Sequence, residues 1–219
     1  AQFAMPTSRT YTLSFWARWM WGNRVLVTRL WGNQLAATNF LPLPETTGTP
    51  GAQNSVYRSN LGPLFRDVVH SPTIPGPTTP VHVRVSVYDP DGIADVAVFY
   101  KPDTSAYYAC TTMYDDGLHD DGAANDGLYG AYIPAHATSQ TVAFALRAID
   151  RLGVDNTWPR DLAQPALYRV EDAALSSAFP IYRIIMTADD AHLLASRPHL
   201  SNEPLNCTFI FDEKDVYYN

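Results

Sequence analysis

Alternation of apolar and polar residues is clearest in the middle of the chain. Between residues 81 and 88, Val alternates with His, Arg, Ser and Tyr, and this period of two is typical of a half-buried strand. Further strands are predicted over residues 94–100, 107–113, 128–133, 141–149 and 167–170. Turn residues separate these segments, and helical periodicity is absent from them. The pattern predicts a mainly β fold, with an antiparallel sandwich of about seven strands over residues 81–172.

Two more alternating segments lie near the start of the chain. Residues 11–21 have a period of two, Gly22-Asn23 is a turn signal, and residues 25–31 form the second segment. They predict a hairpin that carries four of the five Trp residues. A two-stranded hairpin is marginal alone, so we expect it to pair with other domains of the same polypeptide or with neighbouring chains.

Proline separates the hairpin from the sandwich. Residues 42–80 hold eight of the 17 Pro residues. Because Pro lacks a backbone N–H and is excluded from central strands, we predict a Pro-rich linker over residues 51–80.

The last part of the chain has a mixed pattern. Residues 180–186 are strand-like, Thr187 and the acids after it are helix-start residues, and residues 206–211 return to a strand. This order predicts that residues 173–219 are the beginning of an α/β or α+β domain. The chain begins at Ala1 without an initiator Met and ends in strand-like residues. We therefore expect either a segment of a longer polypeptide or a domain with trimmed ends.

Charge is distributed unevenly along the 219 residues. Residues 1–66 hold six Arg and one acid, a local charge of +5, whereas the remainder of the −7 chain carries −12. The Arg residues are scattered and no Lys accompanies them, so we expect no nucleic-acid partner. No apolar run is long enough to span a membrane. The two Cys residues, Cys110 and Cys207, exclude a disulfide scaffold and are expected to be buried or free thiols.

Carboxylates gather in one Gly-containing stretch after residue 113. Its members are Asp115, Asp116, Asp120, Asp121 and Asp126. In a fibronectin-like strand order, this stretch lies at the same end of the sandwich as the turns that hold Asp89, Asp91 and Asp150. Ca²⁺ suits such an arrangement, because it accepts six to eight oxygen ligands in flexible geometry. We therefore predict a calcium site formed by these eight residues. The alternative is a solvated loop whose Asp side chains cap its own backbone amides.

A second candidate site is in the Trp-rich hairpin. Trp16 lies on the opposite face from Trp19 and Trp21, so it is the better candidate for stacking on a glycan. The alternative is that these Trp residues pack in a core or between modules. No nucleophile elbow, phosphate loop or metal-binding His spacing occurs in the chain, so no catalytic residues are predicted and its enzyme status stays open.

The last forty or so residues resemble the start of the spore-coat-H-type (CotH) kinase family. The resemblance rests on Pro180-Ile181-Tyr182-Arg183-Ile184-Ile185-Met186-Thr187, a short Ala/Leu helix, Cys207-Thr208-Phe209-Ile210-Phe211-Asp212 and Val216-Tyr217-Tyr218-Asn219. Members of that family are atypical protein kinases. The resemblance implies that their ATP- and metal-binding residues lie beyond Asn219.

The two earlier parts of the chain also resemble known modules. Residues 81–172 resemble the Ig/fibronectin-III-like modules that precede CotH domains in secreted bacterial proteins, through Met113-Tyr114-Asp115-Asp116-Gly117 and Val142-Ala143-Phe144-Ala145-Leu146-Arg147-Ala148-Ile149-Asp150. Residues 1–50 resemble the C-terminal strands of a jelly-roll-like module.

Together these inferences predict a non-catalytic structural or adhesive segment of an exported multidomain protein, extracellular or at the cell surface and rigidified by Ca²⁺. Two alternatives stay open. In the first alternative, the chain is the accessory region of a CotH-like kinase. In the second, it is a carbohydrate-binding module that uses the Trp-rich hairpin.

Overall fold

The structure, a computed structural model, describes residues 25–29, 36–41, 51, 53, 57–172, 175–198, 201 and 204–218. The chain forms two compact units, residues 1–59 and residues 60–219.

The described strands of the first unit form a two-stranded antiparallel sheet. β1 (Val25–Arg29) pairs with β2 (Ala36–Phe40), with Val25 opposite Phe40. β1 lies within the strand predicted at residues 25–31, whereas β2 was not predicted. The predicted partner strand at residues 11–21, which includes Trp16, is outside the described residues. Glycan binding at Trp16 therefore stays a prediction.

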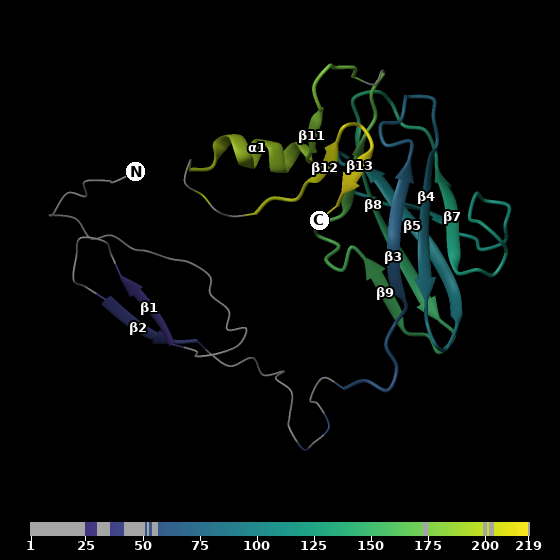
Figure 1. The fold of residues 1–219 in the computed structure, drawn as a ribbon, viewed down its shortest axis with the longest axis horizontal. Coiled ribbons are helices and arrows are strands. Elements are labelled where there is room, and N and C mark those ends of the chain that lie inside the picture. The colour runs from purple at the N-terminus through teal and green to yellow at the C-terminus, as the bar shows by residue number, and fades with distance from the viewer. Residues whose placement is uncertain are drawn as a thin grey trace. The chain divides into compact units, whose positions relative to one another are not determined.

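A three-stranded antiparallel sheet forms one layer of the second unit. It contains β3 (Leu64–Ser71), β4 (Val81–Tyr88) and β7 (Leu128–Ile133), in the order β3-β4-β7 (Figure 1). β4 is the central strand, and it pairs with β7 so that Val83 lies opposite Ala131. The four Val residues of β4 are buried while their neighbours are half-buried or exposed, which is the alternation that the sequence predicts.

The second layer contains five strands. They are β5 (Ile93–Pro102), β6 (Ala109–Thr112), β8 (Thr141–Asp150), β9 (Asp155–Trp158) and β10 (Ala166–Arg169). The order is β10-β8-β5-β6, and β9 also pairs with β8. β8 is long enough to pair with β10 along its first half and with β9 along its second half. β9 is the one strand of this sheet that was not predicted.

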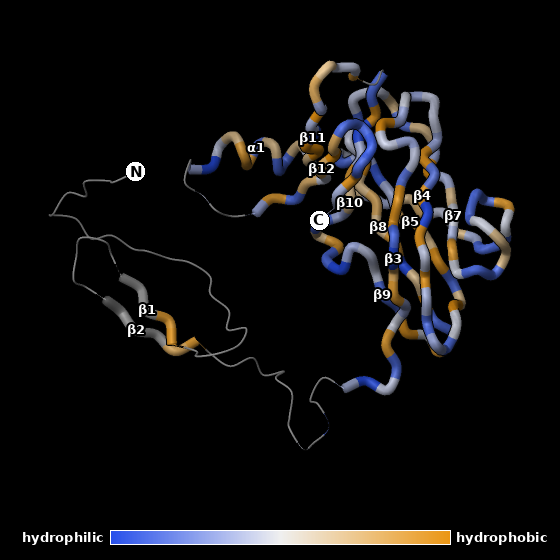
Figure 2. Tube along the Cα trace, viewed as in Figure 1, coloured by the Kyte–Doolittle hydropathy of each residue, from blue (hydrophilic) through white to orange (hydrophobic). Residues whose placement is uncertain are grey.

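The core lies between the two sheets. It contains the Val residues of β4 and β5 and alternate residues of β8, including Phe144 and Leu146, which are fully buried. Figure 2 shows the corresponding alternation of apolar and polar residues along β4. Each fully buried apolar side chain stabilises the fold by roughly 1.5–3 kcal/mol, and together these side chains hold the two sheets together. The prediction of a mainly β, Ig/fibronectin-like sandwich is confirmed.

β3 lies inside the stretch that was predicted to be a linker. The eight residues between Pro63 and Pro72 contain no Pro, so every backbone N–H is available for pairing with β4. Phe65 and Val68 pack against the core, although a bulge interrupts the register near Asp67. The difference from the prediction arises because Pro density was averaged over residues 42–80, although Pro is absent from this strand.

The C-terminal residues form a small sheet and one helix. β11 (Tyr182–Ile185), β12 (Thr208–Phe211) and β13 (Asp215–Tyr217) pair in that order, and α1 (Ala188–Ser196) lies between β11 and β12 in the chain (Figure 1). The predicted helix start is present, because the Thr187 hydroxyl accepts a hydrogen bond from the Asp190 amide at 3.1 Å. No helix in the described residues is long and apolar enough to cross a membrane.

This C-terminal sheet packs directly on the sandwich. Ile185 and Ile210 form a buried cluster with Ala143 of β8 and Leu167 of β10. The Leu167 amide also donates to the Thr208 hydroxyl at 3.0 Å. The C-terminal sheet therefore shares a buried cluster with the sandwich.

Tyr218 contacts residues of both sheets of the sandwich. Its ring packs edge-on against Phe144 of β8 and Trp158 of β9, and its hydroxyl lies 2.5 Å from Nδ1 of His70 on β3. The other ring nitrogen of His70 lies 3.1 Å from the Thr73 carbonyl, which can only accept. Nε2 therefore carries the proton, and Nδ1 accepts from Tyr218. Burial lowers the pKa of His70 to about 4, so the ring is neutral at pH 7.

Candidate functional site

Three of the predicted calcium ligands meet at one end of the sandwich. Asp89 and Asp91 belong to the turn after β4, and Asp150 is the last residue of β8. One carboxylate oxygen from each lies within 4.8 Å of the others. Asp89 and Asp150 are buried whereas Asp91 is exposed, so the cluster has one face towards solvent.

Local hydrogen bonds orient two of these carboxylates. Asp89 accepts from the Asp91 amide at 2.8 Å, which is an Asx turn. Asp150 accepts from the amides of Leu152 and Val154, each at 2.8 Å, and from the Asn60 side chain at 2.6 Å. Burial by itself would raise the pKa of Asp150. The bonds from Asn60 and the amides outweigh burial and hold that pKa below its usual range. Asp150 is therefore ionised at neutral pH.

The acidic loop is built around Asp121. This carboxylate is fully buried and accepts three backbone amides, from Asp116 at 2.6 Å and from Gly117 and His119 at 3.0 Å. Burial would raise the pKa of Asp121, but these amides outweigh it and lower the pKa. The oxygens of Asp121 are therefore engaged by amide N–H groups of the loop itself.

Asp115 and Asp126 hold the ends of the loop together. Asp115 accepts from the amides of Asp126 at 3.1 Å and Gly127 at 2.9 Å. Asp126 in turn accepts from the amides of Ala123 and Leu128. A Cβ at Gly122, where φ is +95°, would lie 2.6 Å from the Asp126 carboxylate, so the loop requires Gly there.

The other two loop carboxylates contact side chains. Asp116 lies 2.9 Å from Nδ1 of His119, and this contact lowers the pKa of Asp116. Asp120 accepts from the hydroxyl of Tyr132 on β7, and that contact raises the pKa of the tyrosine. His119 is half-buried and stacks on Tyr114, with 4.5 Å between the two ring centroids.

The loop also packs against the outer face of the β3–β4–β7 sheet. His82 of β4 reaches the His119 carbonyl at 2.9 Å, and a Cβ at Gly130 of β7 would lie 2.4 Å from that same oxygen. Among the described residues, Asp89, Asp91 and Asp150 form the one group with metal-ligand spacing. The structure does not bring the five loop Asp residues into that group.

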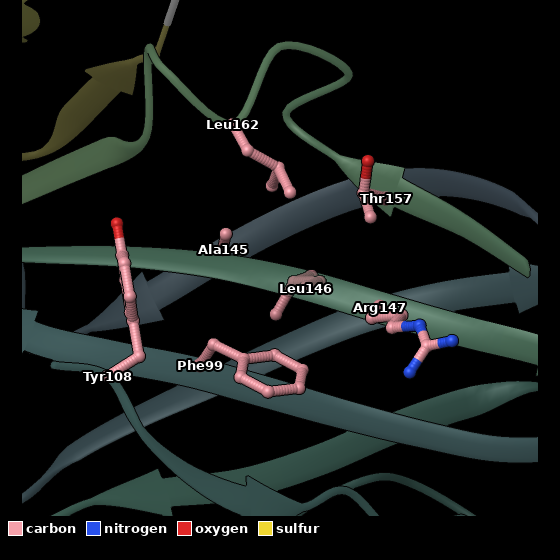
Figure 3. Close-up of a pocket in the computed structure, with 7 residues that line it drawn as sticks. All are labelled: Phe99, Tyr108, Ala145, Leu146, Arg147, Thr157 and Leu162. Atoms are coloured by element: carbon pink, nitrogen blue, oxygen red, sulfur yellow. The ribbon is translucent and has the colours of Figure 1, made fainter.

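An apolar groove lies on the outer face of the β6–β5–β8–β9 sheet. Its volume is about 320 Å³, and its lining residues are Phe99, Tyr108, Ala145, Leu146, Arg147, Thr157 and Leu162 (Figure 3). Tyr108 and Leu162 stand on opposite sides of it, with Ala145 between them. At its β9 end, Arg147 is paired with Asp155 at 2.9 Å.

A second depression of about 430 Å³ continues from this groove. The two share Tyr108 and Leu162. The second depression reaches the start of α1 and is lined by three carboxylates, those of Asp103, Asp189 and Asp190.

Sequence reasoning missed the groove. Its residues come from three strands, β5, β8 and β9, and from two irregular connections, and each has the sequence of an ordinary strand or loop. The adjacent Tyr107-Tyr108 pair was a signal, since both rings are exposed just before β6. Cys110 is exposed on β6 and Cys207 is half-buried, and neither forms a disulfide.

Two antiparallel sheets with this strand order define an Ig-like β-sandwich module. Consistent with this, residues 94–146 match the family described as the conditioned medium factor second Ig-like domain. The matched stretch contains β5, β6, the acidic loop, β7 and the first part of β8. It does not reach residues 173–219, so the CotH resemblance stays a prediction. No curated protein is significantly similar to the chain.

Proposed function

We propose that this chain is a non-catalytic structural and adhesive segment of an exported multidomain protein at the cell surface. The observation that carries the proposal is the apolar groove beside Tyr108 and Leu162. Apolar surface held concave on a rigid sheet is typical of a binding site, because a partner that fills it removes that surface from water. The sandwich supplies the rigid frame.

Export is part of the proposal. The description of the matched family refers to a factor of conditioned medium, which is the fluid that receives what cells release. We extend that location to this chain as part of the proposal.

Adhesion can be tested with beads that carry the whole chain. Beads coated with the chain should be retained on the surface of the cells that produce it, and Leu162→Asp should abolish retention. Leu162 is 53% exposed, so this change leaves the fold intact. Asp172→Asn, at an exposed carboxylate outside the groove, is the matched control. Equal retention of wild-type and Leu162→Asp beads would refute an adhesive role for the groove.

The proposal includes a calcium ion at Asp89, Asp91 and Asp150. Three carboxylates within 4.8 Å repel one another unless a cation or solvent separates them. No described group donates a hydrogen bond to the Asp91 carboxylate, so both of its oxygens are available as ligands. Such an ion would join the turn after β4 to the turn after β8 and stiffen this end of the module.

Thermal unfolding in Ca²⁺ and in EDTA tests the calcium proposal. Saturating Ca²⁺ should raise the Tm of the chain, since an ion that binds the folded state alone stabilises it. Identical melting curves in the two buffers would remove calcium from the proposal and leave adhesion untouched.

A second candidate function follows from the C-terminal sheet. The order β11–α1–β12 is the strand–helix–strand start that the CotH resemblance implies. In this alternative, the chain is the accessory region of a CotH-like kinase. Phosphate transfer from labelled ATP by the full protein, purified from its source, would support it, and the absence of transfer would count against it.

A further inference from the structure

The groove and the depression next to it form one binding surface with two chemically different halves. Tyr108 and Leu162 line both halves and mark the boundary between them. The half over β8 and β9 is apolar, and the half next to α1 is acidic. A ligand that spans the boundary therefore needs two different groups.

The apolar half suits one large apolar side chain. Phe99 and Ala145 form its floor, and Arg147 is held in an ion pair with Asp155. A volume of about 320 Å³ is near the lower limit of known ligand pockets. A sugar ring placed here would leave most of its hydroxyls without partners, which is unfavourable in an apolar site. The lining thus favours an aliphatic or aromatic side chain over a glycan.

The acidic half has an excess of negative charge. Asp103, Asp189 and Asp190 line it together with a single cation, Lys101. The Lys101 ammonium donates to the Ser105 carbonyl at 2.9 Å and lies over the Tyr108 ring at 5.0 Å, so it is already engaged.

The carboxylates keep free acceptor capacity. One oxygen of Asp103 accepts from the Ala188 amide, and one of Asp190 accepts from the Thr187 hydroxyl. Asp189 is exposed. The positive end of the α1 dipole offsets only part of this charge. The acidic half therefore attracts a Lys or Arg side chain.

We propose that this surface binds an extended peptide segment of a partner protein, in which a large apolar residue is followed within a few positions by Lys or Arg. The apolar side chain fills the groove beside Phe99, and the basic group reaches Asp103, Asp189 and Asp190. The inference rests on the proposed adhesive function and names the chemistry of its partner.

The test uses the whole chain and short fluorescent Gly/Ser peptides that carry one Leu and one Arg at varied spacing. Fluorescence anisotropy should show saturable binding of the best peptide, with a Kd between roughly 10 and 1,000 µM. Replacing its Leu by Ser, or Leu162→Asp in the chain, should weaken binding by about tenfold or more.

A charge swap tests the acidic half. Asp189→Lys should weaken the Arg peptide by about threefold and strengthen the matched Glu peptide, while Asp172→Lys, at an exposed carboxylate outside the groove, should change neither. Raising NaCl from about 50 to about 500 mM should weaken the Arg peptide more than an uncharged one.

Three results would overturn the inference. They are no saturable binding by any peptide, unchanged Arg-over-Glu preference in Asp189→Lys, or Leu162-dependent binding of glycan-coated beads in place of the peptides. If Leu162→Asp abolishes cell retention but no peptide binds, adhesion survives and the peptide inference fails.

Discussion

The acidic loop and the Asp89–Asp91–Asp150 cluster are both rich in carboxylates, yet they use them differently. The loop holds five Asp residues close together in the sequence, and three of them accept only backbone amides of the loop itself. The cluster holds three Asp residues from two turns about sixty residues apart, and their oxygens face one another.

A high local density of carboxylates in the sequence is therefore a poor guide to a ligand site. A carboxylate that accepts two or three amides in its own loop is already neutralised by nearby donors. In the cluster, Asp89 and Asp150 also accept amides, but no described group donates to the Asp91 carboxylate, and a cation can relieve its repulsion from the other two. The loop is therefore expected to need its Asp residues for folding, and the cluster to need them for an ion.

Removing Asp121 should have the largest effect. Asp121→Ala leaves the amides of Asp116, Gly117 and His119 without the buried carboxylate that accepts all three. Hydrogen bonds to a charged acceptor are stronger than neutral ones, and we expect the Tm to fall by about 10 °C when three of them are lost. Calorimetry of Asp121→Ala beside Asp116→Ala, an exposed neighbour, checks this. A Tm within error of wild type would show that the loop is not held by its own amides.

Lowering the pH should reveal a contribution of His70 to the stability of the fold, which is separate from both acidic regions. The pKa of His70 falls from 6.5 in the unfolded chain to about 4 in the fold, so the folded state binds fewer protons in this range. Its stabilisation is complete above pH 6.5 and is lost as the pH falls towards 4, by about 3 kcal/mol. Urea unfolding between pH 7 and pH 4 measures this loss.

The carboxyl groups titrate in a lower pH range. The pKa values of Asp121 and Asp150 are lowered, so their stabilisation persists above pH 3.8 and is lost below it. His70→Phe removes the imidazole and should flatten the pH dependence between 6.5 and 4 while keeping the decline below 3.8. If that variant keeps the wild-type profile, His70 is not the titrating group.

A pair of Asn variants compares the two acidic regions directly. Asp91→Asn removes the exposed ligand of the cluster, and Asp116→Asn removes an exposed carboxylate of the loop. If the cluster binds Ca²⁺, a stabilisation of about 5 °C at a large excess of Ca²⁺ should disappear in Asp91→Asn and persist in Asp116→Asn. The reverse result would move the ion to the loop, and loss in both would indicate a shared site.

Much of the sandwich could be predicted because its strands carry their own signal. The Val alternation in β4 and the apolar run in β8 both reflect a buried face, and Thr187 marks the start of α1. β3 and β9 were missed for a physical reason. β3 is flanked by the Pro residues of the predicted linker, which hid its two core-facing apolar residues, whereas β9 is a short edge strand whose place is determined by pairing with β8.

The sites were harder to predict than the fold. The convergence of Asp89, Asp91 and Asp150 followed from strand order, because the turns after β4 and β8 reach the same end of the sandwich. Which Asp residues would be satisfied by amides could not follow from composition, since it depends on positive-φ turns at Gly117 and Gly122. The groove forms only where Leu162, in the connection between β9 and β10, lies beside the sheet. No periodic pattern in the sequence predicts that position.

The smallest effect on stability is expected from the exposed contact between Tyr132 and Asp120 of the acidic loop. Tyr132→Phe removes the hydroxyl that donates to Asp120, and both residues are exposed. Water can replace an exposed partner, so the Tm should fall by no more than about 2 °C. Asp120 raises the pKa of Tyr132, whereas burial raises the pKa of Tyr108, Tyr129, Tyr168 and Tyr218. Ultraviolet titration of the wild type should therefore show one more late-ionising tyrosine than the variant. A large loss of stability in Tyr132→Phe would show that the contact between Tyr132 and Asp120, and not Asp121, holds the loop.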